Sequence, residues 1–282
     1  MMAISASVVK ELRDRTGLGM MDCKKALVEA DGDIEAAIEI LRKSSGMKAA
    51  KKAGRIAADG ILGSKVSGGK GVIVEVNCET DFAAKDESFR AFVETVTGNV
   101  FDTGNSDIDA LGLEAEREAL VQKIGENISI RRAEVFDEDG RVVEYIHTNG
   151  KIGVLIALTG GSEELGRDIA MHIAAMSPTV VRSEDAPAEL VAKEREIYAA
   201  QAEESGKPPE IVEKMIDGRI KKYLAEISLL EQTFVKDGDT KVGALLEKEG
   251  ASVTRFARLE VGEGIEKEEE DFAAEVQKQL GS

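Results

Sequence analysis

The feature that most constrains the fold is a passage that occurs twice in the chain. Residues 59–76, "DGILGSKVSGGKGVIVEV", have strand-like stretches on both sides of a turn at 67–69, the second of them mostly apolar as in a buried strand, which predicts two antiparallel strands. Residues 139–158, "DGRVVEYIHTNGKIGVLIAL", have the same layout, with the turn at 149–150. A chain that repeats a strand hairpin in this way favours two related subdomains.

A helix is predicted after each hairpin, and its apolar residues stand at i, i+3, i+4 and i+7 on one face. The positions are Phe89, Phe92, Val93 and Val96 in the first copy and, 80 residues later, Ile169, His172, Ile173 and Met176 in the second. We interpret the two passages as a duplicated strand–strand–helix unit in an α+β protein. His172 replaces Phe92 on the inward face, so we expect a packed, hydrogen-bonded core histidine.

Helices are predicted on either side of the two units. Residues 1–43 predict three short helices, the first ending at Gly17 and the third N-capped by Asp33. Residues 113–124 predict a helix and the following "ENISIRRAEVF" predicts a strand. From residue 183, two long helices joined by "SGKPP" predict an antiparallel hairpin with an exposed apolar stripe, typical of an interface.

The charge of the chain excludes some partners. Lys and Arg number 37 against 54 Asp and Glu, a formal charge of −17, and there is no Trp. Such a field repels phosphate backbones and offers little for base stacking, so we expect no direct nucleic-acid binding. Residues 42–55, "RKSSGMKAAKKAGR", are the exception, with six basic residues and no acid. This run is either a solvated connector or a docking patch for an acidic partner.

Cysteine content and hydropathy indicate the compartment. Two cysteines, Cys23 and Cys78, are too few for a disulfide framework or a Cys-based zinc site. No stretch approaches the roughly 20 apolar residues of a membrane span, and the N-terminus shows no secretion or import signal. We therefore expect a cytoplasmic protein with no membrane contact.

The search for catalytic and ligand-binding motifs finds little. "GGKG" at residues 68–71 stands in a hairpin turn and lacks the nucleotide-binding loop pattern, and the two histidines have no metal-binding spacing. One enzymatic alternative remains, with Cys78 as nucleophile, His147 as its base and Asp81 or Glu79 as orienter. His147 stands beside the second hairpin turn, where we expect it to be exposed. We predict a protein that is not an enzyme and holds no cofactor or metal.

The corner between the first hairpin and its helix, "CETDFAAK", is predicted to be a loop. It puts Asp81 beside Phe82, and Phe82 lies outside the helical face that begins after Asp86. A Phe at such a corner is either folded into the core or left exposed as an anchor for a partner's pocket, with Asp81 as a directional contact. Its small and polar neighbours favour the anchor.

Several stretches, in order along the whole chain, resemble bacterial translation elongation factor Ts. They include "VKELRDRTGLGMMDCKKALVEADGDIEAAIEILRK", "EVNCETDFAAKDESF", "KIGENISIRR", "SGKPPEIVEKMIDGRIKKY" and "VGEGIEKEEEDFAAEV". Departures from the family pattern are small: Ala83 stands where many members have Val, and Lys236 where some have an apolar residue.

The resemblance implies a division of the chain that matches these segments. It comprises a three-helix, ubiquitin-associated-like domain with the basic connector (1–55), a core N-subdomain (56–138), a core C-subdomain in two parts (139–182 and 229–262), an inserted helical-hairpin dimerisation region (183–228) and a C-terminal module (263–282). The helix expected in that module has Phe272 and Val276 on its apolar stripe, and it packs either on its own body or in a partner's groove.

The resemblance also implies a function: guanine-nucleotide exchange on elongation factor Tu, by a protein with no nucleotide site of its own. In this family the segment Thr80-Asp81-Phe82-Ala83 would enter near the partner's magnesium site, displace the ion and weaken GDP binding. Further partner contacts implied by the resemblance are Arg13, Met20, Met21, Lys24, Ile124, Gly125, His147, Val235, Phe272 and Val276. The rival interpretation is a non-exchanging adaptor that binds through its head.

Overall fold

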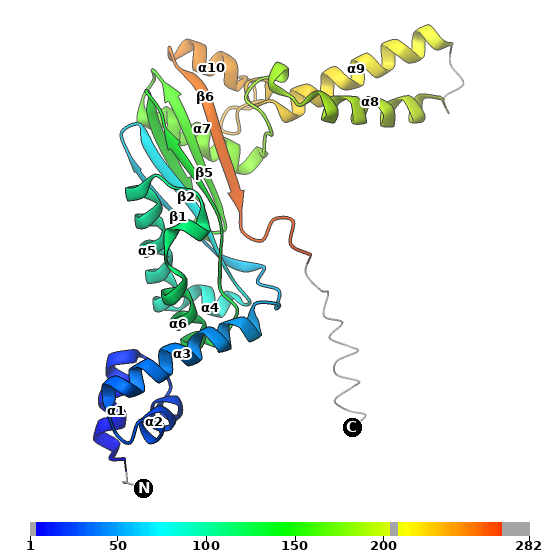
Figure 1. The fold of residues 1–282 in the computed structure, drawn as a ribbon. Coiled ribbons are helices and arrows are strands. Elements are labelled where there is room, and N and C mark those ends of the chain that lie inside the picture. Colours follow the sequence, from blue (N-terminus) through cyan, green and yellow to red (C-terminus); the bar gives the residue numbers. More distant parts are fainter. Residues whose placement is uncertain (1–3, 204–207, 267–282) are drawn as a thin grey trace.

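The computed structural model of the chain describes residues 4–203 and 208–266. A helical head at the N-terminal end is followed by a body with two sheets, and a helical hairpin projects from the far end of that body (Figure 1). The predicted mixed α+β class, with N-terminal helices and two antiparallel sheets, is confirmed. Within the described residues, no helix is both long and apolar enough to cross a membrane. The predicted C-terminal helix lies outside the described residues.

The head has the three predicted helices. Gly17 ends the first with a left-handed φ of 68°, and the Asp33 carboxylate accepts a hydrogen bond from the backbone N–H of Ala36, which starts the third. Cys23 is fully buried in the apolar centre of the head, as a packed thiol. The helices are α1 (Ala6–Thr16), α2 (Met20–Glu29) and α3 (Ile34–Lys52).

Helix α3 is longer than the sequence predicted. The basic run was expected to be a connector after the third helix, but the helix continues through it to Lys52. Ser45 and Ala49 are buried on the side of α3 that faces α6 (Glu114–Ile124). Leu41, on the same helix, packs in the head. One continuous helix therefore contacts both the head and α6, so the basic run is a rigid helix and not a loop.

The body contains two three-stranded antiparallel sheets. Both predicted hairpin turns are confirmed, at Gly68-Gly69 and at residues 147–151, and the predicted strand after α6 completes the first sheet. In each sheet the strand in the middle is the second strand of a hairpin. The first sheet has the order β1 (Asp59–Ser67), β2 (Lys70–Cys78), β3 (Ser129–Asp137), and the second has β4 (Arg141–Ile146), β5 (Ile152–Thr159), β6 (Ser252–Glu260).

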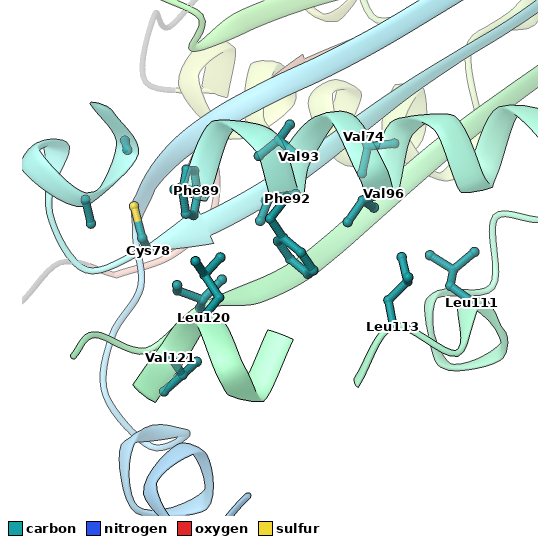
Figure 2. Packing of buried hydrophobic residues seen from close by; sticks show 14 of the residues in the cluster. Val74, Cys78, Phe89, Phe92, Val93, Val96, Leu111, Leu113, Leu120 and Val121 are labelled. Atoms are coloured by element: carbon teal, nitrogen blue, oxygen red, sulfur yellow. The ribbon is translucent and has the colours of Figure 1, made fainter. Parts of the chain in front are cut away.

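Helices cover the outer faces of the sheets. Helix α5 (Glu87–Thr103) packs on the first sheet with α6 beside it, and Figure 2 shows Phe89 and Phe92 of α5 on the side of Leu120 of α6. Helix α7 (Glu163–Met176) and helix α10 (Val242–Lys248) cover the second sheet. A separate apolar cluster fills the space between the sheets, with Leu62, Ile73, Phe136, Leu155 and Leu259 among its members.

The predicted inward faces of the two core helices are confirmed with one exception. Met176 is 46% exposed, because α7 ends at this residue and Ser177 turns the chain with a left-handed φ of 47°. His172 is fully buried and hydrogen-bonded, as predicted: its Nε2 is 2.9 Å from Oε1 of Gln232, and its Nδ1 accepts the backbone N–H of Val235 at 3.1 Å.

The predicted antiparallel helical hairpin is present, formed by α8 (Ala188–Glu203) and α9 (Pro209–Ile227). Its helices pack on each other through a small apolar cluster that includes Val191, Ile216 and Ile220. At its base, Ser183 Oγ lies 3.1 Å from Ser228 Oγ, so the chain leaves and re-enters the body at adjacent points. Short 3-10 turns complete the fold at η1 (Ile108–Leu111), η2 (Ser183–Asp185) and η3 (Leu229–Glu231).

Candidate functional site

The corner after β2 is not the loop that the sequence predicted, because it contains a short helix, α4 (Asp81–Lys85). Thr80 caps its start by accepting a hydrogen bond from the backbone N–H of Ala83 at 3.2 Å. Asp86 then adopts an extended conformation, and its carboxylate accepts the N–H of Ser88 at 2.8 Å to begin α5. Two capped helices thus follow each other with one residue between them, so the corner has a defined shape.

Phe82 is the most exposed large apolar side chain among the described residues, at 81%. The alternative that it folds into the core is therefore wrong. Ala83 and Ala84 on the opposite side of α4 are buried, which fixes this helix on the body while Phe82 points away from it. Lys85 Nζ lies 5.7 Å from the centroid of the ring. An aromatic ring held in water on a fixed support is typical of a binding anchor.

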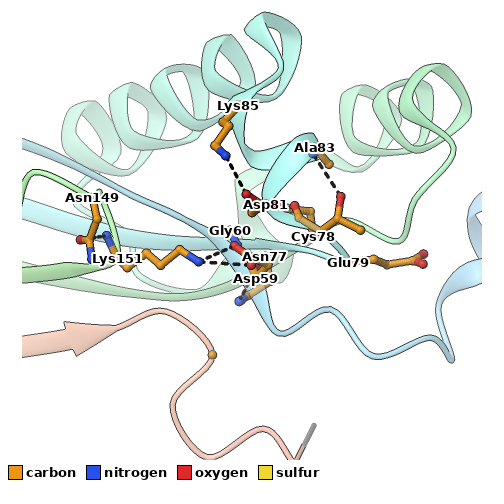
Figure 3. Close-up of polar contacts among 12 residues, drawn as sticks. Asp59, Gly60, Asn77, Cys78, Glu79, Asp81, Ala83, Lys85, Asn149 and Lys151 are labelled. Atoms are coloured by element: carbon orange, nitrogen blue, oxygen red, sulfur yellow. Dashed lines mark hydrogen bonds and ion pairs between the residues drawn. The ribbon is translucent and has the colours of Figure 1, made fainter. Parts of the chain in front are cut away.

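Asp81 is held in its charged form. Lys85 Nζ lies 2.6 Å from Asp81 Oδ2, one helical turn away (Figure 3). The hydrogen bond from Lys85 is the main reason that the pKa of Asp81 lies below its ordinary value. The carboxylate is half-buried and carries its negative charge next to the exposed ring.

A clamp of polar groups holds the start of the corner, and sequence reasoning missed it. The carboxylate of Glu126 accepts hydrogen bonds from the N–H of Glu79 at 3.0 Å, the N–H of Thr80 at 2.9 Å and the hydroxyl of Thr80 at 2.7 Å. In return, Glu79 Oε1 accepts the N–H of Asn127 at 2.5 Å. The only sequence signal was the position of Glu126 and Asn127 directly after the helix stop at Gly125.

The clamp also joins the corner to the end of α3. The side-chain amide of Asn127 donates to the carbonyl of Arg55 at 2.8 Å, and Lys52 donates to the carbonyl of Gly125. Arg55 adds an ion pair to Glu79 at 3.5 Å. Because charge-assisted hydrogen bonds run in both directions, the head helix and the Phe82 corner form one unit.

Five of the predicted partner contacts meet in one place. An open hollow of about 720 Å³ lies between head and body, and it is lined in part by Arg13, Met20, Phe82, Ala83 and Ile124. On α2 the neighbouring side chains of Met20 and Met21 are 56% and 64% exposed, as expected from their position at a helix start. Lys24 is exposed on the same helix, and Gly125 follows Ile124 in the clamp.

The other predicted contacts lie elsewhere. His147 is exposed on the β4–β5 turn, with its Nδ1 3.0 Å from the Tyr145 hydroxyl. The same turn reaches the first sheet, since Lys151 pairs with Asp59 at 3.0 Å (Figure 3). Val235 lies over the second sheet beside His172, away from the hollow that Phe82 lines. Phe272 and Val276 fall outside the described residues.

Cys78 does not have the character of a nucleophile. Its side chain is fully buried at the end of β2 and its thiol donates to the carbonyl of Thr80 at 3.2 Å. Burial, with smaller contributions from Glu126 and Asp59, raises the pKa of the thiol to about 12. Very little thiolate forms at neutral pH, which argues against the alternative of nucleophilic catalysis by Cys78.

Comparison with known proteins gives consistent matches. The family model described as elongation factor TS matches residues 79–263. A protein of Hahella chejuensis named elongation factor Ts is 65% identical over 285 residues, which cover 99% of each chain. Proteins of the same name from Teredinibacter turnerae and Saccharophagus degradans are 59% and 58% identical, each over 100% of this chain and 98% and 99% of their own lengths.

Proposed function

The chain belongs to the elongation factor Ts family of translation elongation factors, and from that premise we propose that it promotes guanine-nucleotide exchange on elongation factor Tu. The observation that carries the proposal is the exposed Phe82 on a short helix whose other face is buried. Exchange by such a factor requires binding energy that is available only when the partner has released its nucleotide. A fixed, solvent-exposed anchor can supply that energy.

In the proposed mechanism, Phe82 enters the nucleotide domain of the partner and Asp81 makes a directional polar contact beside it. The displaced partner segment no longer holds the magnesium ion, and the diphosphate loses the cation that neutralises it. By linkage, a factor that binds the empty partner more tightly than the GDP-bound partner weakens GDP binding by the same ratio. A thousand-fold weakening corresponds to about 4 kcal/mol of differential contact.

The hollow between head and body extends this contact surface. Arg13 and Met20 contribute from the head, and Ile124 contributes from the body next to the clamp. Methionine side chains adapt to the shape of a partner, and the two on α2 are exposed. We assign the nucleotide-domain contact to this whole surface, with His147 approaching the phosphate-binding side from its turn.

The test is stopped-flow release of a fluorescent GDP from elongation factor Tu, with native chain and with Phe82→Ala. Burial of a Phe side chain stabilises a complex by about 1.5–3 kcal/mol, so the variant should accelerate release roughly 10- to 100-fold less. Met176→Ala is the matched control, since Met176 is an exposed apolar residue at the end of α7. Equal acceleration by native chain and Phe82→Ala would remove Phe82 from the mechanism.

The non-exchanging adaptor predicts a different outcome in the same experiment. Native chain would bind elongation factor Tu without accelerating GDP release, and Asp81→Ala would bind as tightly as native chain. We favour exchange because the clamp of Glu126 and Glu79 holds the Phe82 corner in place, which an adaptor bound through its head does not need.

We further propose self-association through the α8–α9 hairpin, because Ile197 and Ile211 are exposed on it at 41% and 48%. Sedimentation of native chain and of Ile197→Asp tests this, with a shift to monomer expected for the variant. The same proposal includes the location of the protein in the cytoplasm. It also includes the division of the chain into units at 1–55, 56–138, 139–182 with 229–262, 183–228 and 263–282.

A further inference from the structure

One face of α3 is exposed along its second half. Lys43, Met47 and Lys51 follow each other at intervals of four residues and all three are exposed, Met47 at 64%. Ile56, just after the helix, is 44% exposed. The opposite side of α3 packs on α6, so this face is the outer one. We call it the α3 basic face, made of Lys43, Met47 and Lys51, with Arg55 and Ile56 exposed just beyond the end of the helix.

The α3 basic face is positively charged in a chain of formal charge −17. Three basic residues of this region have partners, since Lys48 pairs with Asp22 at 3.0 Å, Arg55 with Glu79 at 3.5 Å, and Lys52 donates to the Gly125 carbonyl. Arg42, Lys43 and Lys51 make no ion pair within the described residues 4–203 and 208–266. An apolar side chain flanked by free cations fits a partner that is acidic and amphipathic.

The C-terminal end of the body lies beside the end of α3. Gly262 has a left-handed φ of 77°, and a Cβ at this position would stand 2.3 Å from the carbonyl oxygen of Ala58, so only glycine fits. The N–H of Gly262 donates to Glu75 at 2.8 Å, and Arg132 pairs with Glu263 at 3.2 Å. Figure 1 shows the chain leaving β6 next to the segment that links α3 to β1.

The sequence that follows has the complementary character. Residues 267–282, "KEEEDFAAEVQKQLGS", contain five acids and two lysines, and four of the acids stand together at 268–271. Phe272, Val276 and Leu280 recur every four residues, the same interval as Lys43, Met47 and Lys51. A helix of 16 residues would be about 24 Å long, enough to span the exposed second half of α3 from Lys43 to Lys52, which is about 15 Å long.

We propose that residues 267–282 of the same chain dock on the α3 basic face in the free protein. The acids at 268–271 would meet Lys51 and Arg55 near the exit point, and the apolar stripe would cover Met47 and Ile56. Charge complementarity, sufficient length and the exit beside the end of α3 favour the same chain over a second copy. The inference is independent of nucleotide exchange, because it concerns the protein without any partner.

The experiment is hydrogen exchange by mass spectrometry on the full chain at low micromolar concentration. In native protein, amides of residues 272–280 should exchange at least 10-fold more slowly than in Lys43→Glu/Lys51→Glu. The charge-swapped protein, which adds Glu269→Lys/Glu270→Lys, should recover the slow exchange. Lys193→Glu/Lys214→Glu on the helical hairpin is the matched control and should exchange as native protein does.

Three outcomes would overturn the proposal. The first is fast exchange at 272–280 in native protein, and the second is slow exchange that Lys43→Glu/Lys51→Glu leaves unchanged. The third is slow exchange that appears only when the protein concentration is raised 50-fold, which assigns the contact to a second copy. An unchanged midpoint of urea unfolding for each variant would separate undocking of the segment from unfolding of the body.

Discussion

The first half of the body, from β1 to β3, and the second half, from β4 to β6, follow one plan about 80 residues apart. Phe89 and Val93 of α5 match Ile169 and Ile173 of α7, and all four are buried. The two halves differ in their polar residues at the point where the chain leaves β6 and at the Phe82 corner. The difference teaches that a duplicated framework keeps its apolar contacts and changes its polar positions.

The middle strands differ on the face between the two sheets, where β2 has Glu75 and β5 has Leu155, both fully buried. Leu155 belongs to the apolar cluster between the sheets. Glu75 instead accepts hydrogen bonds from Arg131 at 2.9 Å, Arg132 at 2.6 Å and the N–H of Gly262. A charge in this position is maintained only because it is fully paired, and its partners attach the C-terminal exit to the first sheet.

The corners between strand and helix differ at Asp86 and its match, Gly166. Asp86 ends one helix and caps the next, which leaves α4 as a separate support for Phe82. Gly166 lies within the continuous helix α7, and a Cβ there would stand 2.8 Å from Cγ2 of Val143. The second half therefore brings its helix close to the sheet and presents no anchor.

Replacing Glu75 by an apolar side chain of the kind found on this face of β5, Glu75→Leu, should have the largest effect on stability. Among the described residues, removal of the Glu75 carboxylate leaves Arg131 with only the Glu263 carbonyl and Arg132 with the exposed Glu263 as its remaining ion-pair partner, so we expect a loss of about 3 kcal/mol in the free energy of unfolding, measured by urea denaturation. Glu134→Leu is the control, because that carboxylate is 42% exposed in its ion pair with Arg255, and we expect a loss under about 1 kcal/mol.

The effect of Glu75→Leu on the free energy of unfolding should also depend on pH. Burial by itself raises the pKa of Glu75, but the hydrogen bonds from Gly262, Arg131, Arg132 and Asn77 outweigh it, and the pKa lies below the ordinary 4.5. The unfolded chain therefore takes up the proton first as the pH falls. The stability that Glu75 supplies is fully present above pH 4.5 and declines below it, so the gap between native chain and Glu75→Leu should narrow there. A gap that is constant with pH would contradict this account.

The second expected effect comes from His172→Phe, which gives α7 the residue found in α5. The N–H of Val235 and the side chain of Gln232 lose their partner, so we expect a loss of about 2 kcal/mol at pH 7.5 by urea denaturation. His147→Phe, at an exposed site, should lose far less.

His172 also predicts a pH dependence. Burial lowers its pKa below 6.5, against a smaller opposite contribution from the hydrogen bond with Gln232. Because the unfolded chain binds the proton at higher pH than the folded one, the contribution of His172 is complete above pH 6.5 and is lost as the pH falls below that value. The difference between native chain and His172→Phe should be smaller at pH 5.5 than at pH 7.5. An equal difference in the free energy of unfolding at the two pH values would exclude His172 as the source of the pH dependence.

The smallest expected effect concerns the caps. Asp86→Ala removes the acceptor for the N–H of Ser88, and Ser162→Ala removes the acceptor for the N–H of Leu165 at the start of α7. Each should lower the free energy of unfolding by about 1 kcal/mol in thermal or urea unfolding. Glu87→Ala, next to the first cap, is the control, and an equal loss there would show that the cap itself contributes little.

Periodic apolar patterns were sufficient to predict most elements of the body. Phe89, Phe92 and Val93 indicated their helix, and the apolar run before Cys78 indicated its strand. The extension of α3 was missed because its buried residues in that part are Ser45 and Ala49, which are too small and polar to stand out against six basic neighbours. Helix α4 was missed because five residues contain too little periodicity.

The types of residue in the candidate site could be predicted from the sequence, but their arrangement in space could not. The exposure of Phe82 was predicted from its small and polar neighbours. The clamp by Glu126 did not follow, because it joins polar groups that stand 46 and 47 positions apart and leave no apolar pattern. Val235 is a predicted contact that lies apart from the others. It stands in the second half of the body, where its backbone N–H donates to His172.

The contact of Gly262 with Ala58 has a consequence for the topology of the body. The chain enters β1 and leaves β6 at one point, so the body is a nearly closed ring of chain with a small gap. Its two ends can be joined by a short link and new ends opened at a surface loop without crossing any strand, which is the condition for circular permutation. The head and the C-terminal segment are therefore attached to the body at the same place. The helical hairpin projects from the other end of the body.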